Sequence, residues 1–205
     1  NEPRKGLKVL IDALPIISRF MPEIKVLVAG PGNPDEFLKE IDPHLRYEIC
    51  GSHRREKALS GDIDILITHT RLFSMDSVKK GEHNYLGQIV NRLLERGFLI
   101  DEMLIKPGVL FRGICKLIDH ARQVDFHLVS WDSWPTALLH FTGSKNLNVK
   151  MRRIALTKGY TLTEFGLYKL KDGKKDEAVK IKSERDVFKT LKIKYLEPKR
   201  RELGK

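Results

Sequence analysis

Two aspartates stand two residues apart inside a run that is otherwise apolar: Asp62 and Asp64, in the segment GDIDILIT at residues 61–68. The run has the length and the isoleucine content of a β-strand, so both carboxylates point to the same face of a sheet. Two carboxylates held side by side repel each other, and burial adds the cost of lost hydration. A divalent cation bound between them offsets both costs. The alternative, that both are edge or turn acids, is disfavoured because the neighbours of Asp64 are apolar. The pair therefore predicts a metal-binding strand.

A third aspartate, Asp125, lies in a second strand-like segment, VDFHLV at residues 124–129. If this strand lies beside residues 63–67, three carboxylates converge, as two-metal phosphoryl transfer requires. Taken alone, Asp125 fits an ordinary strand position as well as it fits a metal ligand.

Five residues separate the segment GSHRR, residues 51–55, from Gly61. Gly51 and Ser52 stand where a strand is expected to enter a helix, so their backbone N–H groups can bind phosphate. Arg54 or Arg55 would add charge-assisted hydrogen bonds. A phosphate-binding turn about ten residues from a metal site is the combination that nucleotidyl transfer needs.

Hydrophobic periodicity predicts a mixed α/β and α+β fold. Helices are expected at residues 6–21, 35–41, 85–96, 134–140, 146–157 and 184–191, with a helical turn or two at 54–59. Strands are expected at residues 24–29, 46–50, 63–68, 98–105, 108–118, 124–130, 160–170 and 178–182, with a loop at 171–177. The break at Gly143 marks the expected domain boundary.

Composition excludes several classes of protein. Hydrophobic residues make up 41% of the chain, which is enough for a core, and the chain has only two cysteines. No apolar run approaches the ~20 residues of a membrane span, and no disulfide framework is possible. Residues 1–140 hold 19 basic and 19 acidic residues, so the whole net charge of +11 lies in residues 141–205. Such a basic region favours a nucleic-acid partner over a merely soluble surface.

These segments resemble family X DNA polymerases, the polymerase beta group, over about residues 40–205. The resemblance depends on GSHRR-x5-GDIDILITH, VDFHLV, ALLHFTGSKNLNVKMR, TLTEFGLY and DVFKTLKIKYLEPKRREL, which occur in the family's order. It implies a nucleotidyltransferase-type catalytic palm with a mixed sheet at residues 41–140. A small, basic, DNA-binding thumb would follow at 141–205, and an α/β segment at 1–40 would precede both.

The resemblance also implies roles for particular residues. Asp62, Asp64 and Asp125 would be the catalytic residues and would bind two Mg²⁺, for which Mn²⁺ could substitute. The nucleotide-binding residues would be Gly51, Ser52, Arg55, Gly61, His140, Phe141, Gly143 and Asn148. The DNA-binding residues would be Lys145, Lys150 and Arg152.

The sequence departs from the family pattern at two of these positions. Many relatives carry tyrosine where His140 stands, so discrimination against a ribose 2′-hydroxyl is expected to be weaker or different. A basic residue often stands two positions before the third aspartate, but here Gln123 does, with Arg122 one further back. This puts the orientation of Asp125 in question. No lyase domain and no helix-hairpin-helix element is recognisable before residue 40, so no lyase activity is expected.

Residues 1–36 resemble a different family, the retaining glycosyltransferases with two Rossmann domains. The resemblance covers under a fifth of the chain, so glycosyl transfer is not expected. It suggests instead that the chain is a chimera or a designed fusion, in which residues 1–40 have a structural role.

The predicted function is gap-filling DNA synthesis in DNA repair by a DNA-directed DNA polymerase that lacks the lyase domain. One alternative is a nucleotidyltransferase that acts on an acceptor other than DNA. Another is a non-catalytic, DNA-binding or chimeric scaffold protein. The expected partners are a primer-template or gapped duplex and a dNTP, with no membrane, and the protein is expected to be a monomer. An intracellular location is expected, the nucleus if the source is eukaryotic and the cytoplasm otherwise.

Overall fold

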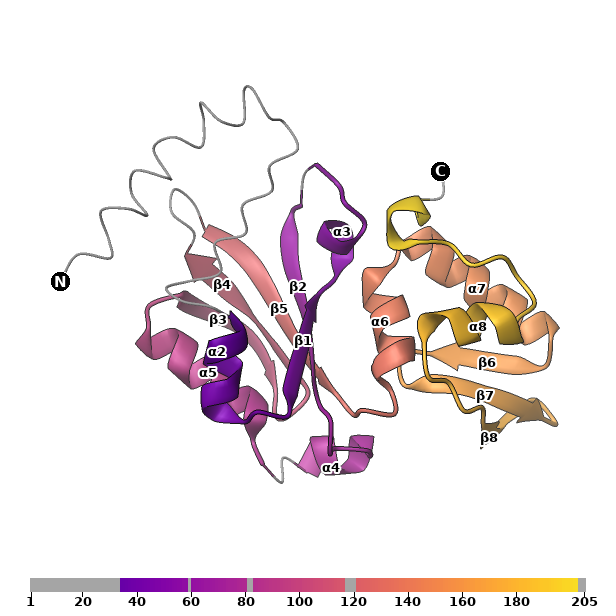
Figure 1. Ribbon diagram of the computed structural model, residues 1–205, viewed down its shortest axis with the longest axis horizontal. Coiled ribbons are helices and arrows are strands. Elements are labelled where there is room, and N and C mark those ends of the chain that lie inside the picture. The colour runs from indigo at the N-terminus through magenta and orange to yellow at the C-terminus, as the bar shows by residue number, and fades with distance from the viewer. Residues whose placement is uncertain (1–33, 59, 81–82, 117–120, 203–205) are drawn as a thin grey trace. The chain divides into compact units, whose positions relative to one another are not determined.

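The structure is a computed structural model, and it describes residues 34–58, 60–80, 83–116 and 121–202 (Figure 1). The helix expected at residues 6–21 and the strand expected at 24–29 lie outside the described residues. So does nearly all of the glycosyltransferase-like segment, on which the chimera hypothesis depends.

A five-stranded mixed sheet forms the larger part of the described fold. Its strands, in the order in which they lie side by side, are β1 (Leu45–Ile49), β2 (Asp62–His69), β5 (Ala121–Val129), β4 (Leu110–Lys116) and β3 (Leu99–Lys106). β2 and β5 are parallel, and every other neighbouring pair is antiparallel. The condition set in the sequence analysis, that residues 124–129 lie beside residues 63–67, is therefore met.

Strand alternation decides which residues of β2 and β5 face which side of this sheet. On β2, Ile63, Ile65 and Ile67 all belong to the main hydrophobic core. Asp62 and Asp64 lie at the alternate positions and therefore face the opposite side. β5 alternates in the same way: Val124, Phe126 and Leu128 enter the main core, so Asp125 and His127 face the other side.

Helices α2 (Pro34–Ile41) and α5 (Tyr85–Glu95) cover the core side of the sheet (Figure 1). Helix α5 buries Leu86, Ile89 and Val90 there, as its apolar periodicity predicts. The short helix α4 (Met75–Lys80) adds Val78 to the same core. This arrangement leaves the side of the sheet that carries Asp62, Asp64 and Asp125 uncovered by α2, α4 and α5.

Helix α6 (Trp134–Thr142) packs on the aspartate side. Its Ala137 contributes to a small core with Cys50, which directly follows β1, Leu66 on β2 and Val129 on β5. Leu139 of the same helix belongs instead to the core of the C-terminal part. Helix α6 therefore connects the two parts of the fold.

The C-terminal part is a three-stranded antiparallel sheet covered by helices. Its elements are β6 (Tyr160–Thr163), β7 (Gly166–Lys171), β8 (Lys174–Ala178), α7 (Lys145–Thr157), α8 (Glu184–Thr190) and the 3-10 helix η1 (Pro198–Arg200). The expected break between helices is present, because α6 ends at Thr142 and Gly143 has φ +71°. Ser144 then caps α7 by accepting a hydrogen bond from the backbone N–H of Leu147.

Four expected elements are wrong in position or missing. The strand expected at residues 160–170 is a hairpin of two strands, β6 and β7, because the chain turns at residues 164–165. The helical turn expected at residues 54–59 is α3 (Gly51–Arg54), because Gly51, with φ +57°, lets the chain turn directly out of β1. The loop expected at 171–177 contains most of β8, and residues 179–182 form no strand. Asp172 and Gly173 both have positive φ, as a two-residue hairpin turn requires, so pairing resumes at once between Lys171 and Lys174. Helix α4 has no counterpart in the sequence analysis.

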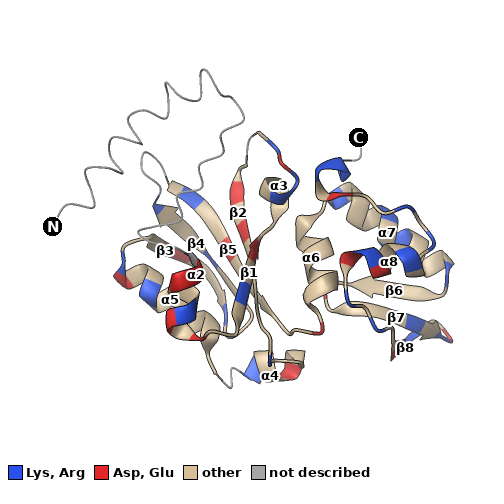
Figure 2. Ribbon diagram, viewed as in Figure 1, with Lys and Arg blue, Asp and Glu red and all other residues tan. Residues whose placement is uncertain are grey.

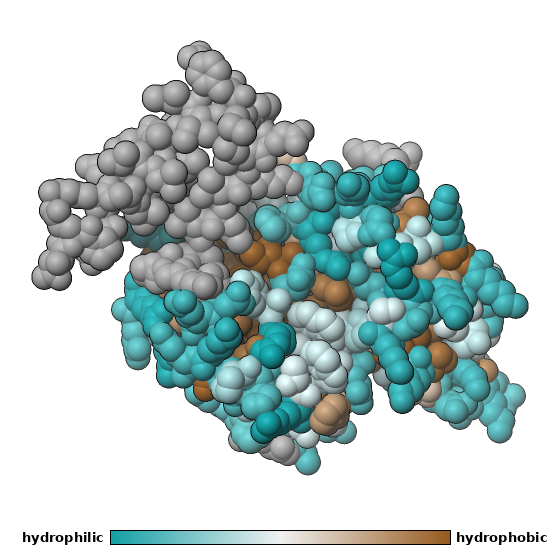
Figure 3. All heavy atoms as spheres, in the orientation of Figure 1, coloured by the Kyte–Doolittle hydropathy of each residue, from teal (hydrophilic) through white to brown (hydrophobic). Residues whose placement is uncertain are grey.

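The described surface is mostly hydrophilic on the face shown in Figure 3, with apolar residues in separate patches. Figure 2 shows acidic residues on β2 and basic residues along α7, α8 and β7. Both cysteines, Cys50 and Cys115, are buried and free. Within the residues that the structure describes, no helix has both the length and the apolar content needed to span a bilayer.

Candidate active site

Asp64 and Asp125 are direct neighbours on the parallel strands β2 and β5. One ligand atom from each of them and one from His127 lie within 4.8 Å of one another. Asp62, two residues before Asp64 on the same face, is exposed at the start of β2 and pairs with Gln123. The sequence-predicted carboxylates are thus gathered at one end of the sheet.

The carboxylate of Asp64 lies in an unfavourable electrostatic environment. Burial, together with the nearby charges of Asp62 and Asp125, raises the pKa of Asp64 to about 6. Burial also lowers the pKa of His127 to about 4, so its imidazole is neutral at pH 7. A cation bound among these groups would relieve the repulsion, and carboxylate oxygens are the ligands that Mg²⁺ prefers.

A cavity of about 420 Å³ opens beside these carboxylates and contains most of the residues named from the sequence. Its lining includes Gly51, Ser52, Arg55, Asp62, Asp64, His140, Phe141, Gly143, Lys145, Asn148 and Arg152. Val149 completes the lining and was not named from the sequence. Three predicted residues, Gly61, Lys150 and Asp125, do not line the cavity, although Asp125 adjoins Asp64.

Gly51 is held against the carboxylate of Asp64. A Cβ at position 51 would lie 2.2 Å from Oδ2 of Asp64, and φ is +57°. The backbone N–H of Cys50 also donates to the carbonyl oxygen of Asp64 at 2.8 Å. Only glycine satisfies both the space and the backbone conformation, so the turn lies directly on the carboxylate strand.

The side chains that follow Gly51 divide between the cavity and the protein interior. Ser52 lines the cavity and its hydroxyl is hydrogen-bonded to that of Ser60. Arg55 also lines the cavity, where its Nη1 donates to the carbonyl oxygen of Thr142 at 2.6 Å and its Nε to Glu202.

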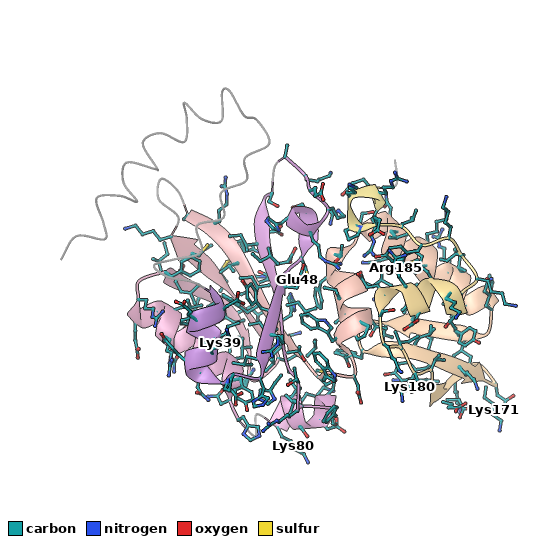
Figure 4. The ribbon with its side chains drawn as sticks, in the orientation of Figure 1. Lys39, Glu48, Lys80, Lys171, Lys180 and Arg185 are labelled. Carbon is teal, nitrogen blue, oxygen red and sulfur yellow. The ribbon has the colours of Figure 1, made fainter. Side chains whose placement is uncertain are left out.

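Arg54 points away from the cavity. It donates two hydrogen bonds to Glu184 and lies 3.3 Å from Oε1 of Glu48, which Figure 4 labels on β1. The residues alone left open which arginine would contact phosphate, and the structure brings Arg55 to the cavity.

The opposite wall comes from α6 and α7. Asn148 donates from Nδ2 to the carbonyl oxygen of His140 at 2.7 Å, and Nη2 of Arg152 lies 3.3 Å from the His140 ring. Phe141 packs on His127, with ring centroids 4.1 Å apart. The wall is therefore tied to the strand that carries Asp125.

Sequence reasoning missed Arg112, which donates three hydrogen bonds to the carboxylate of Asp125. It also missed Glu184 and Arg201, the buried partners of the Arg54 region. No short motif marks these residues, because each acts across strands or across the two parts of the fold.

A second group of possible ligands, Asp42, His44 and His69, lies at the other end of β2. Nδ1 of His69 accepts a hydrogen bond from the backbone N–H of Arg71 at 3.2 Å, so its proton is on Nε2, 3.2 Å from Asp42 Oδ1. A metal on Nε2 would displace that proton to a nitrogen that already faces a donor. This group is therefore better suited to hydrogen bonding than to metal binding.

Two family models match the chain. The DNA polymerase beta palm matches residues 35–133 and the DNA polymerase beta thumb matches residues 137–202. Among curated proteins, DNA polymerase lambda of Rattus norvegicus is 32% identical over 176 residues, which are 79% of this chain and 30% of that protein. DNA polymerase/3'-5' exonuclease PolX of Bacillus subtilis is 27% identical over 170 residues, 83% of this chain and 26% of that protein. The chain spans about a third or less of the length of these relatives.

Two solved structures of polymerase beta from Leishmania infantum have the same fold. The ternary P/T complex has a TM-score of 0.73 and 32% identity, and covers 82% of this chain and 72% of that chain. The ternary gap complex has a TM-score of 0.74 and 30% identity, and covers 82% and 66%.

Proposed function

Because this chain belongs to the polymerase beta group of family X DNA polymerases, we propose that it fills short gaps in DNA during repair by templated addition of deoxynucleotides. The observation that carries the proposal is the single cavity of about 420 Å³ that brings Asp62 and Asp64 together with Ser52, Arg55 and the α6–α7 wall. A cavity with carboxylates at one side and phosphate-binding groups at the other suits a nucleoside triphosphate.

The metal that we propose is Mg²⁺, as two ions held by Asp62, Asp64 and Asp125. The donor set fits, because it consists of carboxylate oxygens, and burial together with the charges of Asp62 and Asp125 already raises the pKa of Asp64 to about 6. Bound there, Mg²⁺ would favour the ionised primer hydroxyl and stabilise the charge that develops on the leaving pyrophosphate.

In the proposed reaction, the 3′-oxygen of the primer forms a bond to the α-phosphorus of the dNTP. The bond from that phosphorus to the bridging oxygen breaks, and pyrophosphate leaves with the electron pair. The hydroxyl proton passes to a carboxylate oxygen of Asp125. Ser52, Arg55 and Gly61 bind the β- and γ-phosphates, which holds the α-phosphorus in line for attack.

The α6–α7 wall would select the nucleotide. His140 and Phe141 would contact the sugar, with Gly143 leaving room for it, and Asn148 would reach the edge of the base. The hydrogen bond between Asn148 and the carbonyl oxygen of His140 supports this arrangement, because it fixes both residues in one wall.

DNA would be bound by the basic C-terminal part. Lys145, Lys150 and Arg152 on α7 would contact the backbone and the template strand, and further exposed cations lie beyond them, including Lys171, Lys180 and Arg185 (Figure 4). We accordingly propose a palm at residues 41–140 and a thumb at 141–205, acting as a monomer. An intracellular location follows from this substrate, nuclear if the source is a eukaryote.

The test is primer extension on a one-nucleotide-gapped duplex with each dNTP and Mg²⁺. The wild type is compared with Asp62→Asn/Asp64→Asn, and Asp172→Asn/Asp176→Asn in the β7–β8 hairpin, where both aspartates are exposed, serves as the charge-matched control. Template-matched extension that is lost only in the Asp62→Asn/Asp64→Asn variant is the expected result. Addition of nucleotides without regard to the template would favour a nucleotidyltransferase that acts on another acceptor. Duplex binding that does not depend on Mg²⁺ and leads to no extension would favour a non-catalytic scaffold protein.

A further inference from the structure

Arg112 is the side chain that holds the third carboxylate. It lies on β4 directly opposite Asp125 on β5. Its Nε donates to both oxygens of Asp125 at 2.9 Å, and its Nη2 also donates to Oδ2. A guanidinium that contacts a carboxylate at several points fixes its orientation as well as its charge.

Asp125 depends on this contact because it is buried. Its side chain is 5% exposed, whereas that of Arg112 is 38% exposed, so the guanidinium reaches inward from the surface. The other hydrogen bond to this carboxylate comes from the neutral amide of Gln123, at 3.1 Å. Among the described residues, Arg112 is the one cationic side chain hydrogen-bonded to Asp125.

The position of Arg112 compensates for the departure at Gln123. Residues 123 and 125 lie on the same face of β5, so a basic side chain at 123 would reach the carboxylate along its own strand. An arginine directly opposite on the antiparallel neighbour reaches the same carboxylate from the side. The positive charge therefore stands on β4 in this chain rather than on β5.

We propose that Arg112 is the positioning residue of the metal centre, holding the carboxylate of Asp125 beside that of Asp64 from the neighbouring strand. Only the expected change in kcat rests on the proposed function. The positioning of the Asp125 carboxylate can also be tested by metal binding, which needs no activity. Residues that orient metal ligands typically contribute about 10- to 100-fold to metal affinity or activity.

The experiment exchanges the two side chains. Arg112→Gln removes the guanidinium, and Arg112→Gln/Gln123→Arg returns it two residues before Asp125 with the composition of the chain unchanged. We expect Arg112→Gln to lower kcat for gap filling by about tenfold or more, with KM for the dNTP within about threefold, and to raise the Mg²⁺ concentration needed for half-maximal rate. The exchange variant is expected to return kcat to within about fivefold of the wild type.

Mn²⁺ binding, followed by electron paramagnetic resonance, is the second measurement and needs no activity. Arg112→Gln should bind Mn²⁺ about tenfold more weakly than the wild type, and the exchange variant should recover. If the wild type binds Mn²⁺ but extends no primer, the proposed function fails and this comparison still decides the role of Arg112.

Arg122→Gln is the matched control, because Arg122 lies next to Gln123 on the opposite face of β5 and is exposed. It should behave as the wild type. Equal Mn²⁺ binding and kcat in Arg112→Gln, or an exchange variant as weak as Arg112→Gln, would overturn the proposal. Arg112→Lys keeps the charge but not the multi-point contact, so wild-type behaviour in this variant would also overturn it. Thermal unfolding of each variant separates these outcomes from misfolding.

Discussion

Arg54 in α3 and Glu184 at the start of α8 are joined by two hydrogen bonds, 3.0 and 2.8 Å long, across 130 positions of sequence. Arg201, whose side chain is fully buried, donates to the same carboxylate. Burial opposes ionisation of Glu184, but the bonds from both arginines outweigh it and hold the pKa of Glu184 below its usual value. The segment that carries Ser52 and Arg55 is thereby attached to the C-terminal part.

Replacing Glu184 by Gln should destabilise the protein by about 3 kcal/mol or more, because it removes the carboxylate paired with the fully buried guanidinium of Arg201 and leaves Arg54 with Glu48 alone. Urea unfolding measures the effect. Glu197→Gln is the control, since it breaks the exposed pair between Glu197 and Arg185 and should change stability by less than about 1 kcal/mol. Equal effects of the two substitutions would contradict the prediction.

Asp64→Asn should stabilise the metal-free protein at neutral pH. Burial, together with the charges of Asp62 and Asp125, raises the pKa of Asp64 in the folded state to about 6, above its ordinary value of 3.8. The folded state therefore holds the proton more tightly, and wild-type stability falls as pH rises from about 4 to 6. The variant should gain roughly 1–2 kcal/mol over the wild type across this window and keep the gain above it. Thermal unfolding of both proteins in EDTA from pH 4 to 8 tests this prediction. Curves of Tm against pH that run parallel for the wild type and Asp64→Asn would contradict it.

Mg²⁺ should offset that difference in stability. A cation bound to the folded state at ten times its Kd stabilises it by about 1.4 kcal/mol. We expect Tm of the wild type to rise with Mg²⁺ at pH 7.5, and Tm of Asp62→Asn/Asp64→Asn to stay constant. A titration of both proteins by differential scanning calorimetry decides it, and an equal rise in the two would place the bound cation elsewhere.

Gly51→Ala should lower both stability and activity. The new Cβ would meet the carboxylate of Asp64 and would also strain a backbone with φ +57°. Gly173→Ala measures the backbone strain alone, because Gly173 has φ +72° and a Cβ there would have nothing within 4 Å. Gly173→Ala should cost about 1 kcal/mol and leave extension unchanged, whereas Gly51→Ala should cost more and abolish extension. Chemical denaturation and gap filling measure the two effects.

Duplex binding should weaken steeply with salt, because the contacts that we propose between the C-terminal part and DNA are with phosphates. Lys145→Ala and Arg152→Ala should each weaken binding for all sequences alike and reduce the slope of log K against log salt by about 1. Fluorescence anisotropy with a labelled gapped duplex at several salt concentrations provides the slopes. Lys39→Ala on α2 is the control and should leave the slope unchanged.

The carboxylate strand was predictable because its information is local. Asp62 and Asp64 stand two residues apart among isoleucines, and a period of two assigns each side chain to a face of the sheet. Asp125 became informative only once β5 was placed beside β2. The sequence alone could state that adjacency as a condition, and the strand order supplied it.

Arg112 and strand β8 were not predictable for different physical reasons. Arg112 acts through the register between β4 and β5, which no pattern within either strand specifies. β8 has the sequence KKDEA, with no apolar alternation, and all five of its residues are exposed. It forms because the tight turn at Asp172 and Gly173 presents it to β7, so tertiary pairing overrides its weak propensity.

Helix α6 has residues in two interiors, Ala137 in one and Leu139 in the other. Neither part of the fold can lose its structure without exposing apolar surface that belongs to the other. We therefore expect palm and thumb to melt in one cooperative transition, and a fragment cut at either end of α6 to lack part of its interior. The palm and the thumb are therefore two regions of a single cooperative folding unit.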